Sequence, residues 1–175
     1  MPLVELCRHC RWAEAQESIL VRPSLMWEAR DHNGYTAAYW TVQNENLKML
    51  NFMLEVIECH PEDQQRQMLM DTFETGSLYG RAPIHAACVY GRKSSFDFLI
   101  RHCPNGAAIL NARDDENDWT PAHFAARWYP EMLNLITEVA ENGSEALNVE
   151  DRRGRTPLDI LMRRNERRMN ALGHY

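Results

Sequence analysis

The sequence has no long apolar run and no leader-like start, and its few cysteines follow no framework. No stretch of about 18 consecutive apolar residues occurs, so we do not expect a membrane-spanning helix. Residues 1–6 lack both a basic start and an apolar run, which argues against a signal peptide. The five cysteines are an odd, scattered set, which favours reduced thiols over disulfides. We therefore expect a cytoplasmic protein, with the nucleus as the alternative, and no membrane contact.

Motifs for the common enzymatic chemistries are also missing. The sequence has no Gly-rich phosphate loop, no Gly-x-Ser-x-Gly elbow, and no pair of carboxylates at helical spacing beside a nucleophile. We therefore predict a protein that is not an enzyme and has no catalytic residues, no cofactor and no small-molecule substrate. A reactive Cys–His pair is the enzymatic alternative. Alkylation kinetics distinguish it, because an activated thiolate is labelled faster than ordinary cysteines.

What the chain does have is enough apolar residues for a core, and an uneven charge. Hydrophobic residues make up 45% of the sequence, and the formal net charge is −6. Residues 151–175 hold seven arginines against three carboxylates, which gives +4, so residues 1–150 carry −10. Arginine clusters can bind nucleic-acid phosphates. We do not expect nucleic acid here, because the body is acidic and no aromatic stacking platform is interleaved with those arginines. Two explanations remain for these arginines, namely a solvent-exposed capping unit and a binding site for an acidic protein partner.

One short pattern recurs at intervals of tens of residues and predicts helix starts. In DWTPAHFAA, residues 118–126, the Thr120 hydroxyl can accept from the free amides of a helix start, and Pro121 suits the first helical residue. The pattern returns as RAPIHAAC at 81–88, RTPLDILM at 155–162 and, more faintly, YTAAYWTV at 35–42. Repetition at such a period is typical of stacked repeats.

Each copy is preceded by a turn and followed by a second helix. A turn residue stands two positions before each helix start, and a polar residue stands five positions before it. These pairs are Gly34 with Asp31, Gly80 with Ser77, Asp118 with Asp115, and Gly154 with Asp151. They indicate tight turns in which the glycine takes a positive φ. Apolar residues at helical spacing then predict second helices over 47–57, 96–100 and 132–139.

Residues 58–75 make the first interval longer than the others. Pro61, Glu62 and Asp63 form a helix-start pattern ahead of an apolar stretch, so we expect an extra helical turn or two there. A disordered insert is the alternative.

The whole pattern resembles the ankyrin repeat, a turn plus two antiparallel helices built on Thr-Pro-Leu-His. The copies nearest to it begin at Thr120 and Ala82, and in the last copy Asp159 replaces the histidine. The resemblance implies an all-α solenoid of stacked helix-turn-helix units with hairpin-like turns, in a single domain over residues 1–175. The implied units are an N-terminal cap at 1–30, repeats at 31–76 (with the insert), 77–114 and 115–150, and a basic C-terminal cap at 151–175.

The resemblance also assigns structural roles. His85 and His123 would bond to backbone and tie one unit to the next, rather than act in catalysis. Gly91 would end a first helix in a left-handed cap, and its place in the other units is taken by Cys10, Glu45, Tyr129 and Asn165.

Two cysteines and a histidine near the start of the sequence resemble part of a zinc site. Cys7, His9 and Cys10 are spaced like part of a zinc knuckle, but no second pair of ligands follows. Cys7 also aligns with Cys88 at a small site in the first helix of its unit. Packing explains this residue, and we predict no metal site.

The resemblance further implies one concave groove, lined by the turn tips and the ends of the first helices. Binding surfaces favour Trp, Tyr and Arg, because these side chains bury a large area and keep a polar handle. Mapped position by position, the aromatic anchors would be Tyr35, Tyr79, Tyr90, Trp119 and Trp128. The arginines that would pair with carboxylates of a partner are Arg81, Arg127, Arg153 and Arg155.

These residues predict a non-enzymatic module that binds another protein, with acidic patches, through the groove. Trp119 is expected to have no duty to the helix that follows it, so changing Trp119 and Trp128 to Ala should leave the thermal melt nearly unchanged and abolish partner capture. The alternative is that some of these aromatic rings pack against a neighbouring turn tip, in which case the change would impair folding. The alternative is a structural scaffold subunit, or a fragment of a larger assembly, that uses its edges at Arg8, Arg167 or residues 58–75.

Overall fold

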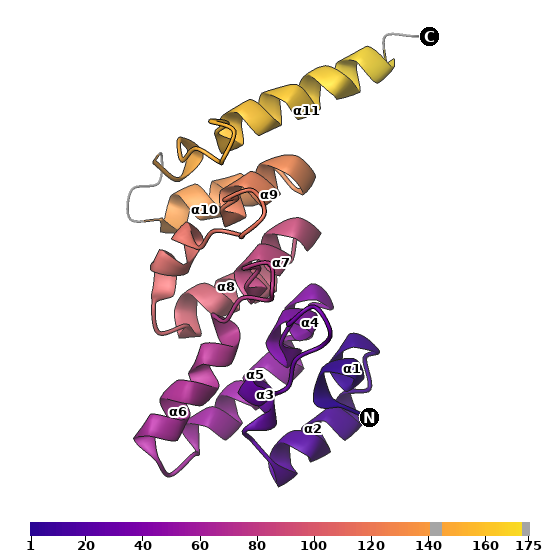
Figure 1. Cartoon of the computed structure of the whole chain (residues 1–175), viewed down its shortest axis with the longest axis vertical. Coiled ribbons are helices and arrows are strands. Elements are labelled where there is room, and N and C mark those ends of the chain that lie inside the picture. Colours follow the sequence, from indigo (N-terminus) through magenta and orange to yellow (C-terminus); the bar gives the residue numbers. More distant parts are fainter. Residues whose placement is uncertain (141–144, 173–175) are drawn as a thin grey trace.

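The computed structural model describes residues 1–140 and 145–172, and this part of the chain is all-helical, without a strand. Residues 141–144, within the predicted unit 115–150, and residues 173–175, at the end of the predicted unit 151–175, lie outside the described residues. The helices stack in layers along the long axis of the molecule, from α1 at one end to α11 at the other (Figure 1). The all-α prediction is therefore confirmed.

The helices form an inner and an outer row. The inner row consists of α1 (Leu3–Arg8), α4 (Ala37–Gln43), α7 (Pro83–Tyr90), α9 (Pro121–Trp128) and α11 (Pro157–Leu172). The outer row consists of α2 (Trp12–Val21), α5 (Leu47–Glu58), α8 (Lys93–His102) and α10 (Met132–Val139). The connections carry α3 (Leu25–Glu28), α6 (Asp63–Met70) and short 3₁₀ helices at Asp71–Phe73, Gly106–Asn111 and Glu145–Leu147. No helix of the described ranges is both long and apolar enough to cross a membrane.

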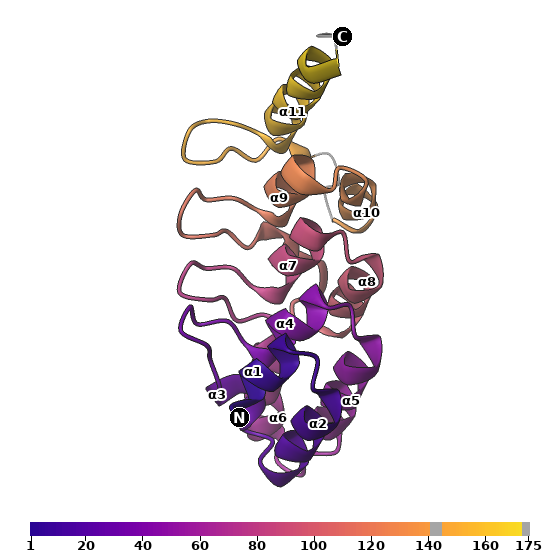
Figure 2. The ribbon, with the colours of Figure 1, turned by 90° about the vertical axis from the view of Figure 1, so that its right-hand side faces the viewer.

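The inner helices α1, α4, α7 and α9 each pack on the next inner helix and on an outer helix of their own, and α11 packs on α9. Seen from the side, the long loops that precede α4, α7, α9 and α11 project together beside the inner row, and the outer row covers the opposite side (Figure 2). The molecule thus has one open face, made of loops and inner helices.

Small residues let the inner helices lie close together. Ala86 and Ala87 of α7 and Ala125 and Ala126 of α9 have no exposed surface. The outer row fills the core with larger side chains, chiefly Leu50, Met53, Ile57, Phe96, Leu99, Met132 and Ile136. The apolar runs that predicted second helices over 47–57, 96–100 and 132–139 lie in α5, α8 and α10, so those three helices are confirmed.

Two buried histidines join neighbouring layers, as predicted. The Nδ1 atom of His85 accepts from the Ala82 N–H at 3.0 Å, and its Nε2–H donates to the Ala112 carbonyl at 3.2 Å. His123 repeats the arrangement, with the Thr120 N–H 3.1 Å from Nδ1 and the Arg155 carbonyl 3.1 Å from Nε2. Each ring is therefore a neutral imidazole that caps its own helix and holds the chain of the next layer.

In the last layer Asp159 takes the place of the histidine. Its Oδ2 accepts from the backbone N–H and from the hydroxyl of Thr156, both at 2.9 Å. A carboxylate can accept hydrogen bonds as the imidazole Nδ1 does. It has no N–H, so it cannot donate to a carbonyl of a further layer as the imidazole Nε2–H does.

The turns between inner and outer helices differ in their backbone. Gly91 has φ +65°, and Cys10 and Glu45 take the same left-handed conformation at +58° and +53°. Tyr129 does not, because its φ is −136° and the chain turns through Pro130 into α10. The fifth expected turn, at Asn165, is absent, since α11 runs through this residue without a break.

Residues 58–75 are largely helical, as predicted. Helix α6 begins at Asp63 after Glu62, and the 3₁₀ helix Asp71–Phe73 follows it. Leu69 and Phe73 bury their side chains in the core, so the segment is part of the packed structure.

The neutral histidines make the fold sensitive to acid. Burial lowers the pKa of His85 from its ordinary 6.5 to about 4, so the unfolded chain takes up a proton in a range where the folded chain does not. Stability should therefore fall from pH 6.5 to 4 by about 1.4 kcal/mol per pH unit, or about 2 kcal/mol at pH 5. Urea unfolding at pH 7 and pH 5 measures this. His85→Gln should flatten the pH profile, and the exposed control His102→Gln should not. An unchanged slope in His85→Gln would contradict the assignment.

Gly91 and Gly154 form a matched pair, because both have φ +65°. A Cβ on Gly154 meets nothing within 4 Å, whereas a Cβ on Gly91 would lie 2.5 Å from the Tyr129 ring. Gly154→Ala should cost about 1 kcal/mol of backbone strain, and Gly91→Ala about 2 to 3 kcal/mol, because overpacking is added. Urea denaturation of Gly91→Ala, Tyr129→Ala and the double variant tests the clash. Additive effects in the double variant would rule it out.

Candidate functional site

Four loops on the open face, at 31–35, 77–81, 114–119 and 151–155, share one hydrogen-bonding pattern. In each, a side-chain oxygen of the first residue accepts from two backbone N–H groups of the same loop. The N–H of that residue also donates to the carbonyl of the last residue of the loop. The first residues are Asp31, Ser77, Asp114 and Asp151. The prediction that Asp115 begins the third loop is wrong by one position. The third loop begins at Asp114, because it is one residue longer than the others.

The predicted turn residues do take a positive φ. It is +80° at Gly34, +71° at Gly80, +57° at Asp118 and +65° at Gly154. Asp118 can replace glycine because a short polar side chain tolerates this conformation better than most.

Backbone hydrogen bonds connect each loop to the next. The N–H of Leu78 donates to the Asn33 carbonyl at 2.9 Å, and the N–H of Asp115 donates to the Tyr79 carbonyl at 2.9 Å. The N–H of Arg152 then donates to the Asn117 carbonyl at 3.0 Å. The loops therefore form a connected platform, on which side chains are held in fixed positions.

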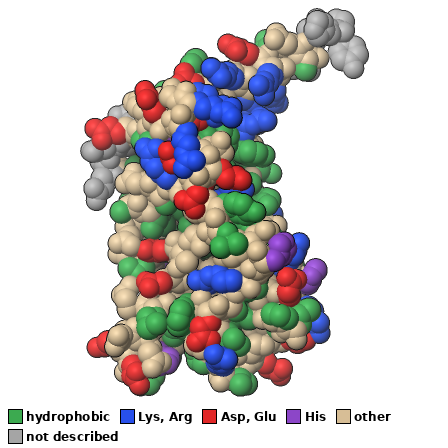
Figure 3. Space-filling view, viewed as in Figure 1, with side chains coloured by type: hydrophobic (Ala, Val, Ile, Leu, Met, Phe, Trp, Pro, Cys, Tyr) green, Lys and Arg blue, Asp and Glu red, His purple; other side chains and the backbone are tan. Residues whose placement is uncertain are grey.

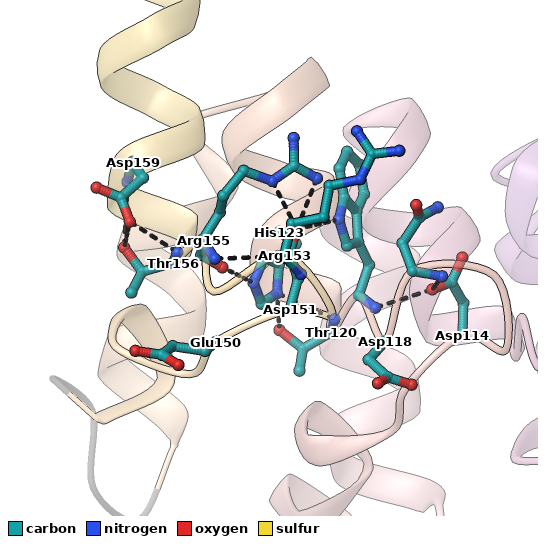
Figure 4. Close-up of polar contacts among 12 residues, drawn as sticks. Asp114, Asp118, Thr120, His123, Glu150, Asp151, Arg153, Arg155, Thr156 and Asp159 are labelled. Atoms are coloured by element: carbon teal, nitrogen blue, oxygen red, sulfur yellow. Dashed lines mark hydrogen bonds and ion pairs between the residues drawn. The ribbon is translucent and has the colours of Figure 1, made fainter.

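Asp151 is the most fully bonded residue of this platform (Figure 4). Its Oδ1 accepts from the backbone N–H groups of Arg153 and Arg155 at 2.8 and 3.0 Å. Its Oδ2 accepts from the Trp119 indole at 2.9 Å and from the Arg155 guanidinium at 2.9 and 2.6 Å. Burial alone would raise the pKa of this carboxyl, but the bonds from Arg155, Arg153 and Trp119 hold it well below its usual range.

The last residue of each loop, immediately before the helix cap, is half-buried. This position holds four predicted binding residues, namely Tyr35, Arg81, Trp119 and Arg155. Trp119 donates to Asp151 of the next loop, and Arg155 pairs with the same carboxylate. For Trp119 the structure therefore bears out the alternative, contact with the neighbouring loop. Its indole N–H is used in joining two layers, and only part of the ring faces outward.

Arg81 is likewise committed to neighbouring side chains. Its guanidinium pairs with Glu116 and lies 3.5 Å from Asp114, so it contacts the third loop from the second. The same group lies over the Phe124 ring, 5.4 Å from its centre, and 6.0 Å from the centre of Tyr79. Arg81 thus acts first as a bridge between layers.

Rings follow one another along the open face. Tyr35 contacts Tyr39 and Trp40, with ring centres 4.0 and 5.9 Å apart, and Arg8 lies over Trp40. At the other end, Trp119 contacts Phe124 and Trp128 at 5.2 and 5.9 Å. Tyr90, half-buried on α7, lies between these two groups in the chain order, and its pKa is raised by burial and by Tyr35.

The remaining predicted residues are exposed. Trp128 is 45% exposed and Tyr79 is 38% exposed, and Arg127 and Arg153 also face solvent. The Arg127 guanidinium lies 5.3 Å from the centre of the Trp128 ring. Neither arginine forms an ion pair within the described ranges, so both charges are available to a ligand.

A small hollow of about 80 Å³ opens where α11 leaves the stack. Its lining consists of Trp119, Arg127, Arg155, Ile160, Arg163, Arg164 and Arg167. Basic side chains gather along α11 on the face shown in Figure 3. Residues 163, 164 and 167 belonged to the predicted basic cap. Arg167 was missed as a neighbour of Arg127, although its one-turn spacing from Arg163 signalled a shared helix face.

Sequence reasoning missed Trp40 and Phe124 as parts of this face, which also includes the loop tip Leu78. Leu78, at the tip of the second loop, is 71% exposed. Trp40 donates through its indole to Asp31 at 3.1 Å, and Phe124 lies between Arg81 and Trp128. The signal for the last two was their place on the inner helices, next to residues already chosen.

No group of three His, Cys, Asp or Glu side chains in the described ranges is placed to hold a metal ion. Cys7 is fully buried in α1, and burial raises its pKa to about 12, which is the opposite of an activated thiolate. No protein-family model and no curated protein sequence matches this chain.

The two tryptophans at this site should respond differently to the same substitution. Trp119→Phe removes the indole donor to Asp151 and should cost about 1.5 kcal/mol, because a hydrogen bond to a buried charge is lost. Trp128→Phe removes no hydrogen bond found in the described structure and should stay within about 0.5 kcal/mol. Chemical denaturation of both variants measures the loss in the free energy of unfolding for each. Equal effects would show that the indole–carboxylate bond contributes nothing.

Proposed function

We propose that this chain is an ankyrin-like solenoid that binds another protein through its open face and has no enzymatic activity. The recurring loop pattern, the backbone bonds between loops and the two inter-layer histidines support the solenoid. They are the features that a stack of equivalent units needs, because each unit must satisfy the polar backbone of its neighbour. The paired rows of helices support it as well.

The main support for the binding function is that the Trp128 ring is both exposed and fixed in position. Its ring is 45% exposed, yet it is held by Phe124 at 6.1 Å and Trp119 at 5.9 Å. An aromatic side chain that is already fixed loses little conformational entropy when a partner covers it. Such residues carry most of the energy in protein interfaces. A ring needed only for the fold would be covered by the fold.

The charges around Trp128 indicate the kind of partner. Arg127 lies beside the ring and Arg153 stands at the tip of the last loop, and both lack an ion pair in the described ranges. The rest of the chain is acidic, with −10 in residues 1–150. An acidic segment of a partner would therefore be attracted to this end of the face and repelled elsewhere, which fixes its orientation.

The alternative is a scaffold that uses its N-terminal edge. It is favoured by a hollow of about 450 Å³ beside Trp27 and Met68, and by Leu20 and Val21, which are 64% and 86% exposed. In this case the partner would contact the α2–α3 connection and α6.

Trp128→Ala should separate binding from folding. It should lower stability by only about 1 kcal/mol, because nearly half of the ring is already in solvent, and weaken partner capture at least thirtyfold. The measurement is affinity purification from cells with mass spectrometry, followed by titration of the captured protein. Arg101→Ala, on the exposed side of α8, serves as the neutral control.

The same experiment distinguishes the two functions. Capture that is lost with Trp128→Ala and kept with Val21→Ala supports the open face. Capture that is kept with Trp128→Ala and lost with Val21→Ala would assign binding to the N-terminal edge.

A further inference from the structure

The arginine-lined hollow beside α11 is more positive than a solvated helix end requires. It brings together five guanidinium groups, from Arg127 on α9, from Arg155 in the last loop and from three arginines of α11. Two carboxylates stand against them, namely Asp151, which is bonded to Arg155, and Asp159, one turn before Arg163. Five positive charges against two negative ones leave a formal charge of +3.

The arrangement of these arginines lowers the stability of helix α11. Arg163 and Arg167 are four residues apart, so they lie on one face of α11 and repel each other. Neither they nor Arg127 form an ion pair with any carboxylate of the described ranges. An exposed helix is usually stabilised by alternating charges on such a face. An anion between these guanidinium groups would turn the repulsion into attraction.

The size of the hollow limits what that anion is. The hollow has a volume of about 80 Å³. A single phosphate or carboxylate group fits this space. A nucleobase or a drug-sized ligand does not, because such ligands occupy pockets of about 300 Å³ or more.

The walls of the hollow indicate what the anion is attached to. Trp119 and Ile160 supply the apolar part of the lining. The Trp119 indole N–H is already used by Asp151, so this ring offers only its carbon surface. A lining of both apolar and guanidinium groups suits an anionic group at the end of a side chain, because the carbon atoms of that side chain can contact Trp119 and Ile160.

We propose that this hollow binds the phosphate monoester of a phosphorylated serine, threonine or tyrosine side chain. The proposal rests on the proposed protein-binding function, since the phosphate would be carried by the partner that covers Trp128. A monoester carries about −1.5 to −2 charges at pH 7, which matches +3 better than a single carboxylate does. Guanidinium groups also present paired donors that fit phosphate oxygens.

Side-chain NMR of the ¹⁵N-labelled arginines tests the site directly. Phosphoserine is titrated into the full chain at pH 7.5, with sodium chloride at matched ionic strength as the blank. Saturable shifts are expected for Arg127, Arg163 and Arg167. Glutamate should bind at least about tenfold more weakly than phosphoserine, because it offers one charge instead of nearly two. Dimethyl phosphate, a diester with one charge, should be equally weak.

Matched variants distinguish a specific anion site from a general electrostatic attraction to positive charge. Arg163→Gln/Arg167→Gln should weaken phosphoserine binding at least tenfold, with the thermal melt unchanged. Arg101→Gln/Arg168→Gln removes the same charge from exposed arginines outside the hollow and should bind as the parent does. Equal losses in both doubles, or shifts no larger than those with chloride, would overturn the proposal. Equal binding of dimethyl phosphate would instead assign the hollow to phosphodiesters such as nucleic-acid backbones.

The two proposals can fail separately. If phosphoserine binds and Trp128→Ala still captures the partner, the anion site stands and the binding face does not. If Trp128→Ala loses the partner and phosphoserine fails to bind, the binding face stands and the phosphate assignment is overturned.

Discussion

The structure depends on one recurring interaction, a buried imidazole N–H that donates to a backbone carbonyl of the next layer. His85 reaches Ala112, and His123 reaches Arg155. Each bond satisfies a partly buried carbonyl, and leaving such a group unpaired would cost more than the bond gains. The distance between layers and the direction of the loops follow from it. Alanines at the contacts between inner helices then become necessary, since larger residues would hold the layers too far apart for the bond to form.

The open face is rigid because its residues serve two purposes. Asp151 holds the backbone of its own loop, and it also receives the indole of Trp119 and the guanidinium of Arg155. In the third loop Asp114 holds the backbone in the same way and receives Arg81 of the second. A ring or charge fixed by such bonds is presented to a partner at low entropic cost. The same bonds explain why a face rich in tryptophan and arginine need not be loosely attached to the fold.

Charge divides this face into two regions. Between neighbouring loops arginines meet carboxylates, as Arg81 meets Glu116 and Arg152 meets Asp118. Beside α11 positive charge is in excess, because Arg127, Arg163 and Arg167 line the same hollow and none of them forms an ion pair within the described ranges. A partner is therefore oriented by electrostatics at one end and by aromatic contact next to it. Screening by salt would weaken the first effect and leave the second.

The sequence by itself determined the local features, because these depend on residues near one another in the chain. Thr36, Pro83 and Pro121 marked helix starts, Gly34, Gly80 and Gly154 marked positive φ, and the pattern at residues 61–63 marked α6. The tertiary structure alone decided which groups meet. The third loop begins at Asp114 because its extra residue must be absorbed while its backbone still bonds to Tyr79. Trp119 is engaged because Asp151, 32 residues away, reaches it once the layers stack. The hollow exists because α11 brings its arginines alongside α9. None of these contacts has a local signal, since each is a distance between separate layers that packing sets.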